Sequence, residues 1–234
     1  MDINNELKNL YKGYWSNLLL NSCGKNSAHP LLIKVDKEYQ VSDLKVMIVG
    51  QETDGWNGSF EYKKKNINEL MYDYYNYFYN IAETDRLKER LKKKRKRPFW
   101  NKKNFKYFQE KLKKEFPNKK ISFIWNNVSK IGKLDSGKPT ETIKKFEDKY
   151  FKDVFKHEIK ILKPDVIIFT TGDRKIPLKH NSVKSVKEEQ VSEIIFDDFP
   201  KIVAVRTYHP NARIQGGKKH LKKQVLDNII QKIK

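Results

Sequence analysis

Several features are missing from this 234-residue sequence, and each absence excludes a class of protein. A single cysteine, Cys23, excludes an intramolecular disulfide and any iron–sulfur or metal site built from several cysteines. We also expect no metal of any other kind. No apolar run approaches the roughly 20 residues needed to span a bilayer, so we expect no membrane segment. The first residues lack a basic stretch followed by an apolar one, which argues against a signal peptide and for a cytoplasmic protein.

Two glycine-rich phosphate-binding motifs are also absent. The sequence contains neither Gly-x-Gly-x-x-Gly nor Gly-x-x-x-x-Gly-Lys-Ser/Thr. Both motifs place backbone N–H groups against phosphates at the start of a helix, so their absence lowers the expectation of dinucleotide or nucleoside triphosphate binding. We therefore predict no cofactor.

Basic residues are abundant. Lysine and arginine number 50 against 29 aspartate and glutamate, which gives a formal charge of +21. The excess is concentrated in a block over residues 86–103, which is interrupted by Pro98, Phe99 and Trp100. A polyanionic partner, most simply nucleic acid, is the natural inference, and an anionic membrane surface is the alternative.

The apolar pattern predicts alternating strands and helices. Strands are expected at 44–50, 121–125, 164–172, 191–196 (as an edge strand) and 202–207, and helices at 3–21, 66–82, 101–115, 140–162 and 217–234. This alternation favours an α/β fold, a three-layer α/β/α sandwich with a mostly parallel central sheet. No linker rich in glycine, serine or proline interrupts the chain. We therefore predict one domain over 1–234, with a basic insertion around 84–104.

Polar side chains follow three of the predicted strands. They are Gln51, Glu52 and Asp54 after the first strand, Asn126 and Asn127 after the second, and His209, Asn211 and Arg213 after the last. Ligands of open α/β sheets bind at the carboxyl ends of strands, so one ligand could touch all three groups. Structural alternatives exist: Asp54 could cap a helix, the asparagines could lie in a turn, and His209 could cap the turn before Pro210.

The three strand ends, in this order, resemble the motifs of the uracil-DNA glycosylase superfamily. Val49-Gly50-Gln51-Glu52-Thr53 is similar to the strand that ends in Gly-Gln-Asp-Pro-Tyr-His or Gly-Glu-x-Pro-Gly. Phe123-Ile124-Trp125-Asn126-Asn127 resembles the strand that ends in a base-reading asparagine, and Tyr208-His209-Pro210-Asn211-Ala212-Arg213 resembles the His-Pro-Ser/Ala loop. The resemblance spans about residues 44–213.

The resemblance implies a role for each matching residue. Glu52 would activate water, Asn126 (or Asn127, if the register slips by one) would pair with the base, and His209 would stabilise the leaving pyrimidine at O2. Gln51 takes the place of a family glutamate, and Asp54 is a second carboxylate without a clear counterpart. Trp56 or Phe60 could stack on the base. Residues expected to contact DNA are Asn211, Arg213, Lys94, Arg95, Arg97, Lys218 and Lys219.

Departures from the motif bear on the substrate. Thr53 replaces the motif proline, so this loop is expected to be less rigid. Asp54 replaces the tyrosine that closes the pocket against C5 substituents, and Gly55 adds no bulk. The open gate suggests a base larger than uracil, such as a sugar-decorated hydroxymethylcytosine of phage DNA, and hence a bacterial or phage-associated protein.

Three hypotheses follow. The first is a monofunctional, monomeric DNA glycosylase that flips out a uracil or a bulkier modified cytosine and leaves an abasic site. The second is a non-catalytic module that binds modified or damaged DNA on the same fold. The third is an RNA-directed or membrane-surface protein whose charge is generic. The basic block could dock on DNA or form a solvated, partly disordered loop, and Lys218 and Lys219 could lie on a solvated helix face.

Overall fold

The computed structural model describes residues 2–62, 64–135, 137–182, 186–214 and 219–234. Within it the chain divides into two compact units, each assembled from three separate stretches. The first unit comprises Met1–Asp36, Gln51–Ile81 and Asn126–Lys163; the second comprises Lys37–Gly50, Ala82–Trp125 and Pro164–Lys234. Because the stretches interleave along the sequence, composition marks no boundary between the units. The single domain stays a prediction.

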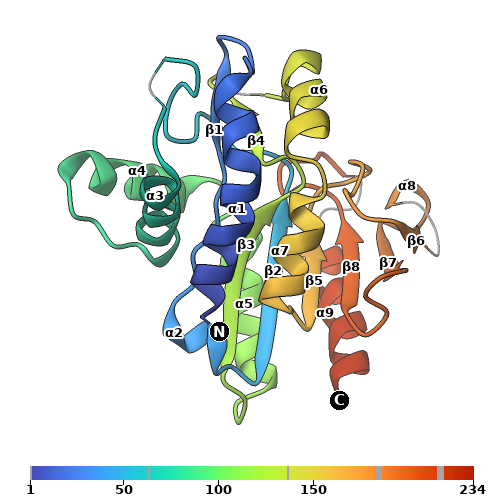
Figure 1. Cartoon of the computed structure of the whole chain (residues 1–234). Helices are drawn as coiled ribbons and strands as arrows, with labels where there is room; N and C mark the ends of the chain where they lie inside the picture. The colour runs from blue at the N-terminus through green and yellow to red at the C-terminus, as the bar shows by residue number, and fades with distance from the viewer. Residues whose placement is uncertain (1, 63, 136, 183–185, 215–218) are drawn as a thin grey trace. The chain divides into compact units, whose positions relative to one another are not determined.

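The second unit contains most of a mixed six-stranded sheet, so the chain is an α/β protein. The strand order is β3-β2-β5-β8-β7-β6. The bounds are β2 Leu44–Gly50, β3 Ile121–Asn127, β5 Val166–Phe169, β6 His180–Ser182, β7 Val191–Phe196 and β8 Val203–Thr207. Strands β2, β5 and β8 run parallel and lie side by side, whereas β7 and β6 add antiparallel pairs (Figure 1).

Two strand predictions need correction. The sequence predicts β7 at an edge, but β6 pairs with its outer side, so β7 is internal. β6 is short and polar (His-Asn-Ser) and gives no apolar signal in the sequence. β5 is also shorter than the predicted 164–172, because the chain leaves the sheet after Phe169.

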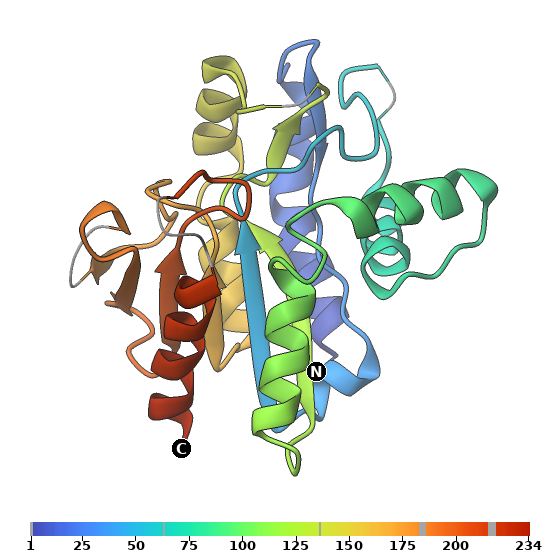
Figure 2. The same cartoon turned by 180° about the vertical axis from the view of Figure 1, so that it is seen from behind.

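Helices α5 and α9 lie on one face of this sheet (Figure 2). α5 spans Phe105–Glu115, α9 spans Lys219–Ile233, and α9 packs on β8 and β7. The unit also contains the short helices α2 (Lys37–Gln40) and α8 (Val186–Glu189). The expected helices 101–115 and 217–234 are therefore confirmed in type.

Most of the basic block is a helix, α4 (Asp85–Lys96), and not a disordered loop. The Thr84 side chain accepts a hydrogen bond from the N–H of Leu87 and caps the helix. Asp85 lies in the first turn and four basic residues lie in the last, which suits the helix dipole at both ends. Cap and charge distribution thus explain why so charged a segment is helical.

The first unit packs helices around α1. Its elements are α1 (Ile3–Leu20), α3 (Ile67–Tyr79), α6 (Glu141–Tyr150), α7 (Val154–Leu162) and the antiparallel pair β1 (Ser27–Pro30) and β4 (Ile131–Lys133). α1 contacts α3, α6 and α7 through a face that includes Leu7, Tyr11 and Leu18. The predicted helices 3–21 and 66–82 are confirmed, and Tyr74 and Tyr77 of the tyrosine-rich run are core residues.

The single helix predicted over 140–162 is wrong, because α6 ends at Tyr150 and α7 begins at Val154. Asp153 has φ of 62°, a left-handed conformation that a continuous α-helix does not allow. The apolar spacing continues across the break, so periodicity alone does not reveal it. Among the described residues, no helix is long and apolar enough to cross a membrane.

Candidate functional site

The carboxyl ends of β2, β5 and β8 share one edge of the sheet in the second unit. The pairing is parallel and in register, with Val49 opposite Phe169 and Phe169 opposite Arg206. The chain leaves this edge at Gly50, at Phe169 and at Thr207. The first motif begins at the end of β2, and the last motif begins directly after β8. The sheet topology therefore brings the starts of these two motifs to the same edge.

His209 lies two residues beyond β8, in a turn. Its carbonyl oxygen accepts a hydrogen bond from the N–H of Ala212 at 2.8 Å, and its Nδ1 accepts one from the N–H of Asn211 at 3.2 Å. The second hydrogen bond assigns the ring proton of neutral His209 to Nε2, so this nitrogen can donate to an oxygen. The turn-capping alternative is thus observed. Asn211 and Arg213 are exposed.

The loop after β2 is held in the first unit. The carbonyl oxygen of Gln51 accepts from the N–H of Ser129 at 2.9 Å, and the N–H of Gly55 donates to the carbonyl oxygen of Lys133 at 3.0 Å. Thr53 is buried against Gly132, where an added Cβ would lie 2.1 Å from the Thr53 carbonyl oxygen. Close packing therefore restrains the loop at the position where the family motif has a proline. Glu52 is half-buried and Asp54 is exposed.

Asn126 is completely buried, and a polar network binds its amide. Its Nδ2 donates to Glu158 at 3.0 Å, and its Oδ1 accepts from Lys130 Nζ at 2.7 Å and from the N–H of Asn127 at 2.8 Å. The amide thus already makes the kind of hydrogen bonds that base pairing would require. Asn126 lies at the end of β3, but its side chain is hydrogen-bonded to Glu158 and Lys130 within the protein.

Lys130 and Glu158 form the centre of this network. Their side chains are 1% and 0% exposed, with Nζ and Oε1 2.8 Å apart. The Tyr11 hydroxyl donates to Glu158 Oε1 at 2.8 Å and accepts from the N–H of Ile33 at 2.9 Å. Burial lowers the pKa of Lys130, and Glu158 opposes that shift. Burial, and then Glu158, raise the pKa of Tyr11.

Glu147 of α6 is a second carboxylate near Lys130. It accepts backbone hydrogen bonds from Lys130 at 2.6 Å and Ile131 at 3.3 Å. Burial raises the pKa of Glu147 to about 7, and the two backbone bonds oppose this shift. Glu147 therefore fixes the turn between β3 and β4.

The proposed stacking residues are part of the core. Phe60 is 1% exposed, and its ring lies edge-on to Trp15 and His29. Trp56 is buried edge-on to Tyr77, at 5.3 Å between ring centroids. Asn127, at the end of β3, is also buried. Neither Trp56 nor Phe60 presents a ring face to solvent, because both contribute to packing.

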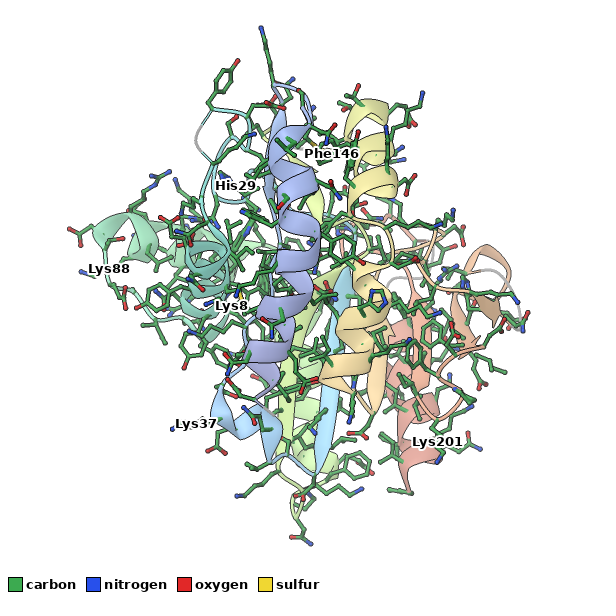
Figure 3. The ribbon with its side chains drawn as sticks, viewed as in Figure 1. Lys8, His29, Lys37, Lys88, Phe146 and Lys201 are labelled. Carbon is green, nitrogen blue, oxygen red and sulfur yellow. The ribbon has the colours of Figure 1, made fainter. Side chains whose placement is uncertain are left out.

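Lys94 is not on the DNA-facing surface where the sequence pattern predicts it. It is 4% exposed, and its Nζ lies 4.5 Å from the centroid of the Trp100 ring. Burial, and then Arg95, lower the pKa of Lys94 to about 7. Arg95 and Arg97 are exposed, as is Lys219, whereas Lys218 lies outside the described residues. Lys88, nearer the start of α4, points away from the molecule (Figure 3).

The segment after α4 is anchored to the sheet of the second unit. The Trp100 ring meets Trp125 of β3 at 4.9 Å between centroids, and Asn104 Nδ2 donates to Thr170 Oγ1 at 3.3 Å. Thr170 directly follows β5, so the basic helix is tethered beside the carboxyl edge. The half-buried Phe99 and Trp100 lie next to the exposed cations of α4.

The sequence pattern does not single out Lys130, Glu158 or Arg206, all of which are buried and charged. Burial lowers the pKa of Arg206, and Asp173 opposes the shift. Nothing in their local sequence marks these residues. Among the described residues, no group of three or more histidine, cysteine, aspartate or glutamate side chains could hold a metal ion.

No protein-family model matches the sequence, and no curated protein matches it significantly.

Proposed function

We propose that the chain is a monofunctional DNA glycosylase that hydrolyses the N-glycosidic bond of uracil or of a bulkier modified cytosine. The observation that carries the proposal is the parallel order β2-β5-β8, which brings the starts of the Gly50-Gln51-Glu52 segment and the Tyr208-His209-Pro210 segment to one edge of the sheet. The uracil-DNA-glycosylase-like, three-layer arrangement is part of the proposal. So are a DNA partner, a monomeric state and a bacterial cytoplasmic location.

Glu52 and His209 take complementary roles in this reaction. Water adds to C1′ of the extruded nucleotide while the bond to the base breaks and its electron pair leaves with the base. The Glu52 carboxylate orients the water, accepts its proton and stabilises the positive charge on the sugar, by the logic of glycoside hydrolysis. The His209 Nε2–H donates to the oxygen of the departing anion.

We assign base recognition to Asn127 ahead of Asn126. The hydrogen bonds of Asn126 with Lys130 and Glu158 support this assignment, because breaking them would leave a buried ion pair short of a hydrogen bond. Side chains alternate along a strand, so Asn127 points to the other face of β3. The exposure of Asp54, with Gly55 beside it, supports a base that carries a substituent at C5.

The alternative is a non-catalytic module that binds modified or damaged DNA. The internal engagement of Asn126 and the packing of Phe60 favour it, since both differ from an open reading pocket. Saturable binding to one modified DNA without base release would establish it.

The deciding experiment is a base-release assay on a panel of DNA duplexes and single strands. The panel contains uracil, thymine mismatches, hydroxymethylcytosine and glucosylated hydroxymethylcytosine, and alkali converts abasic sites into strand breaks. We expect breaks in one substrate with the wild type and with Glu110→Gln, which removes an exposed carboxylate of α5. We expect none with Glu52→Gln. Breaks in no substrate would contradict the proposal.

A further inference from the structure

Two buried polar side chains face each other across the β7–β8 pair. Ser192 and Arg206 are directly opposite in the antiparallel register. They are 2% and 8% exposed. Residues directly opposite in such a pair project to the same face, with Cβ atoms about 5 Å apart. The hydroxyl and the guanidinium are therefore neighbours on one face of the sheet.

This face is the one opposite α9. Lys232 of α9 bonds to Glu193 of β7, and side chains alternate along a strand, so Ser192 points away from α9. On that side the segment after β5 meets Arg206: an Nη2 hydrogen bond reaches the Arg174 carbonyl oxygen at 3.3 Å. The subsite thus lies between two strands and the Arg174 segment, within the second unit.

Both side chains have unused hydrogen-bonding capacity. Within the described part of the chain, Arg206 Nε and Ser192 Oγ are buried and have no hydrogen-bond partner. Most buried side-chain polar atoms in proteins are hydrogen-bonded. Two neighbouring buried atoms without a hydrogen bond therefore need an explanation. A guanidinium keeps its charge in a protein, and burial of that charge is unfavourable unless an anion is close. Asp173 is the one carboxylate that acts on Arg206 among the described residues, and it makes no hydrogen bond to Arg206 Nε.

We propose that Arg206 and Ser192 form an oxyanion-binding subsite that takes a phosphate group. Arg206 Nε–H and the Ser192 hydroxyl each donate to a phosphate oxygen, and the guanidinium supplies the opposite charge. The segment after β5 carries Arg174 and Lys175 together with one carboxylate, Asp173, so its net charge is positive. Arg206 lies three residues before His209, so the subsite belongs to the carboxyl edge of the sheet. It does not require that base release occurs.

The test is binding of inorganic phosphate to the full-length protein, measured by calorimetry and by thermal shift against chloride at equal ionic strength. We expect phosphate to bind and to raise the Tm of the wild type. Ser192→Ala, which removes one hydroxyl, should weaken phosphate binding roughly tenfold or more. Arg206→Gln should abolish it; if this variant does not fold, Ser192→Ala carries the test.

Lys179→Gln is the matched control, because it removes one positive charge from a side chain that is 87% exposed in the same unit. It should bind phosphate as the wild type does. If phosphate binding weakened equally in Lys179→Gln and Ser192→Ala, the effect would not be specific to the subsite, and the proposal would be overturned. Absence of phosphate binding in the wild type would overturn it too.

A second arm identifies the source of the phosphate. If the group is a DNA phosphodiester, Ser192→Ala weakens binding to an abasic-site duplex and inorganic phosphate competes with that duplex. If the group is a free phosphate, DNA binding is the same in both proteins while inorganic phosphate still binds. Either result supports the subsite, and neither depends on the outcome of the base-release assay.

Discussion

The two units bury positive charge in different ways. In the first unit Lys130 meets the carboxylate of Glu158 at 2.8 Å, and Tyr11 and Asn126 complete the network. In the second unit Lys94 lies over the ring of Trp100, and Arg206 donates to a backbone carbonyl while its Nε has no hydrogen-bond partner in the described residues. A buried charge that is paired within the protein, as Lys130 is with Glu158, has a structural role. A buried cation that keeps an unused donor, as Arg206 does, can serve a ligand.

The largest expected effect comes from breaking the matched pair. Glu158→Gln leaves the Lys130 ammonium buried without this counter-charge, and the free energy of unfolding should fall by about 3–5 kcal/mol. The double variant Lys130→Met/Glu158→Gln removes both charges and should be destabilised clearly less. Urea unfolding of the single and double variants measures this. A double variant destabilised by the sum of both single effects would contradict the idea of a matched pair.

Replacing Lys94 should raise the free energy of unfolding, whereas Glu158→Gln should lower it, and the effect at Lys94 should depend on pH. Its folded pKa is about 7, and the unfolded value is about 10.4. The unfolded chain binds more protons between these values, so the wild type gains stability as the pH rises from 7 to 10. Lys94→Met should therefore be more stable than the wild type at pH 6, by up to roughly 4 kcal/mol, and the difference should shrink by pH 9.5.

Denaturant unfolding at the two pH values checks the Lys94 prediction, with Lys92→Met as an exposed control on the same helix. A difference between Lys94→Met and the wild type that does not change with pH would show that the Lys94 amine keeps an ordinary pKa.

Arg206→Met should change the free energy of unfolding less than Glu158→Gln does. Without phosphate the variant should unfold within about 1 kcal/mol of the wild type or be more stable, because the substitution removes one hydrogen bond to a carbonyl together with a buried charge. Thermal unfolding in phosphate-free buffer measures it. A destabilisation as large as that of Glu158→Gln would mean that Arg206 is as firmly matched as Lys130.

The exposed cations of α4 should have the smallest effect on stability and a clear effect on DNA binding. Replacing Lys92, Arg95 and Lys96 with glutamine should leave the free energy of unfolding within about 0.5 kcal/mol of the wild-type value. Each DNA phosphate that the variant no longer neutralises should reduce the slope of log K against log salt by about 0.9. Fluorescence anisotropy across a salt series measures the slope, and an unchanged slope would remove α4 from the DNA-binding surface.

The elements predicted correctly are those in which local pattern and tertiary structure agree. β2 and β8 contain the apolar runs 46–49 and 203–205, and α1 and α3 have clear helical spacing, α3 with a capping box at Asn66 and Glu69. β1 and β4 are too short to show a pattern. The break at Asp153 depends on a backbone angle that no residue type there requires.

The candidate site is predictable in position and not in its contacts. The strand ends of β2, β3 and β8 follow from the apolar runs and the polar residues after them. The engagement of Asn126 depends on Glu158, which is bonded to Tyr11 at a separation of 147 residues. Likewise Lys94 sits within a charge block, and only the packing of Trp100 shows that it is buried. Pairings between distant residues are set by the fold, so the local sequence does not reveal them.

Glycosylase chemistry at the ends of β2 and β8 is tested most directly by the single-turnover rate of base release. The rate is measured for the wild type, Glu52→Gln and His209→Ala on the best substrate of the panel. We predict a rate about 100-fold or more below the wild type for each variant, because each substitution removes a group that acts mainly in the transition state. Circular dichroism and unchanged unfolding would confirm that both variants fold. Rates equal to the wild type in folded variants would contradict the assignment of the chemistry to the ends of β2 and β8.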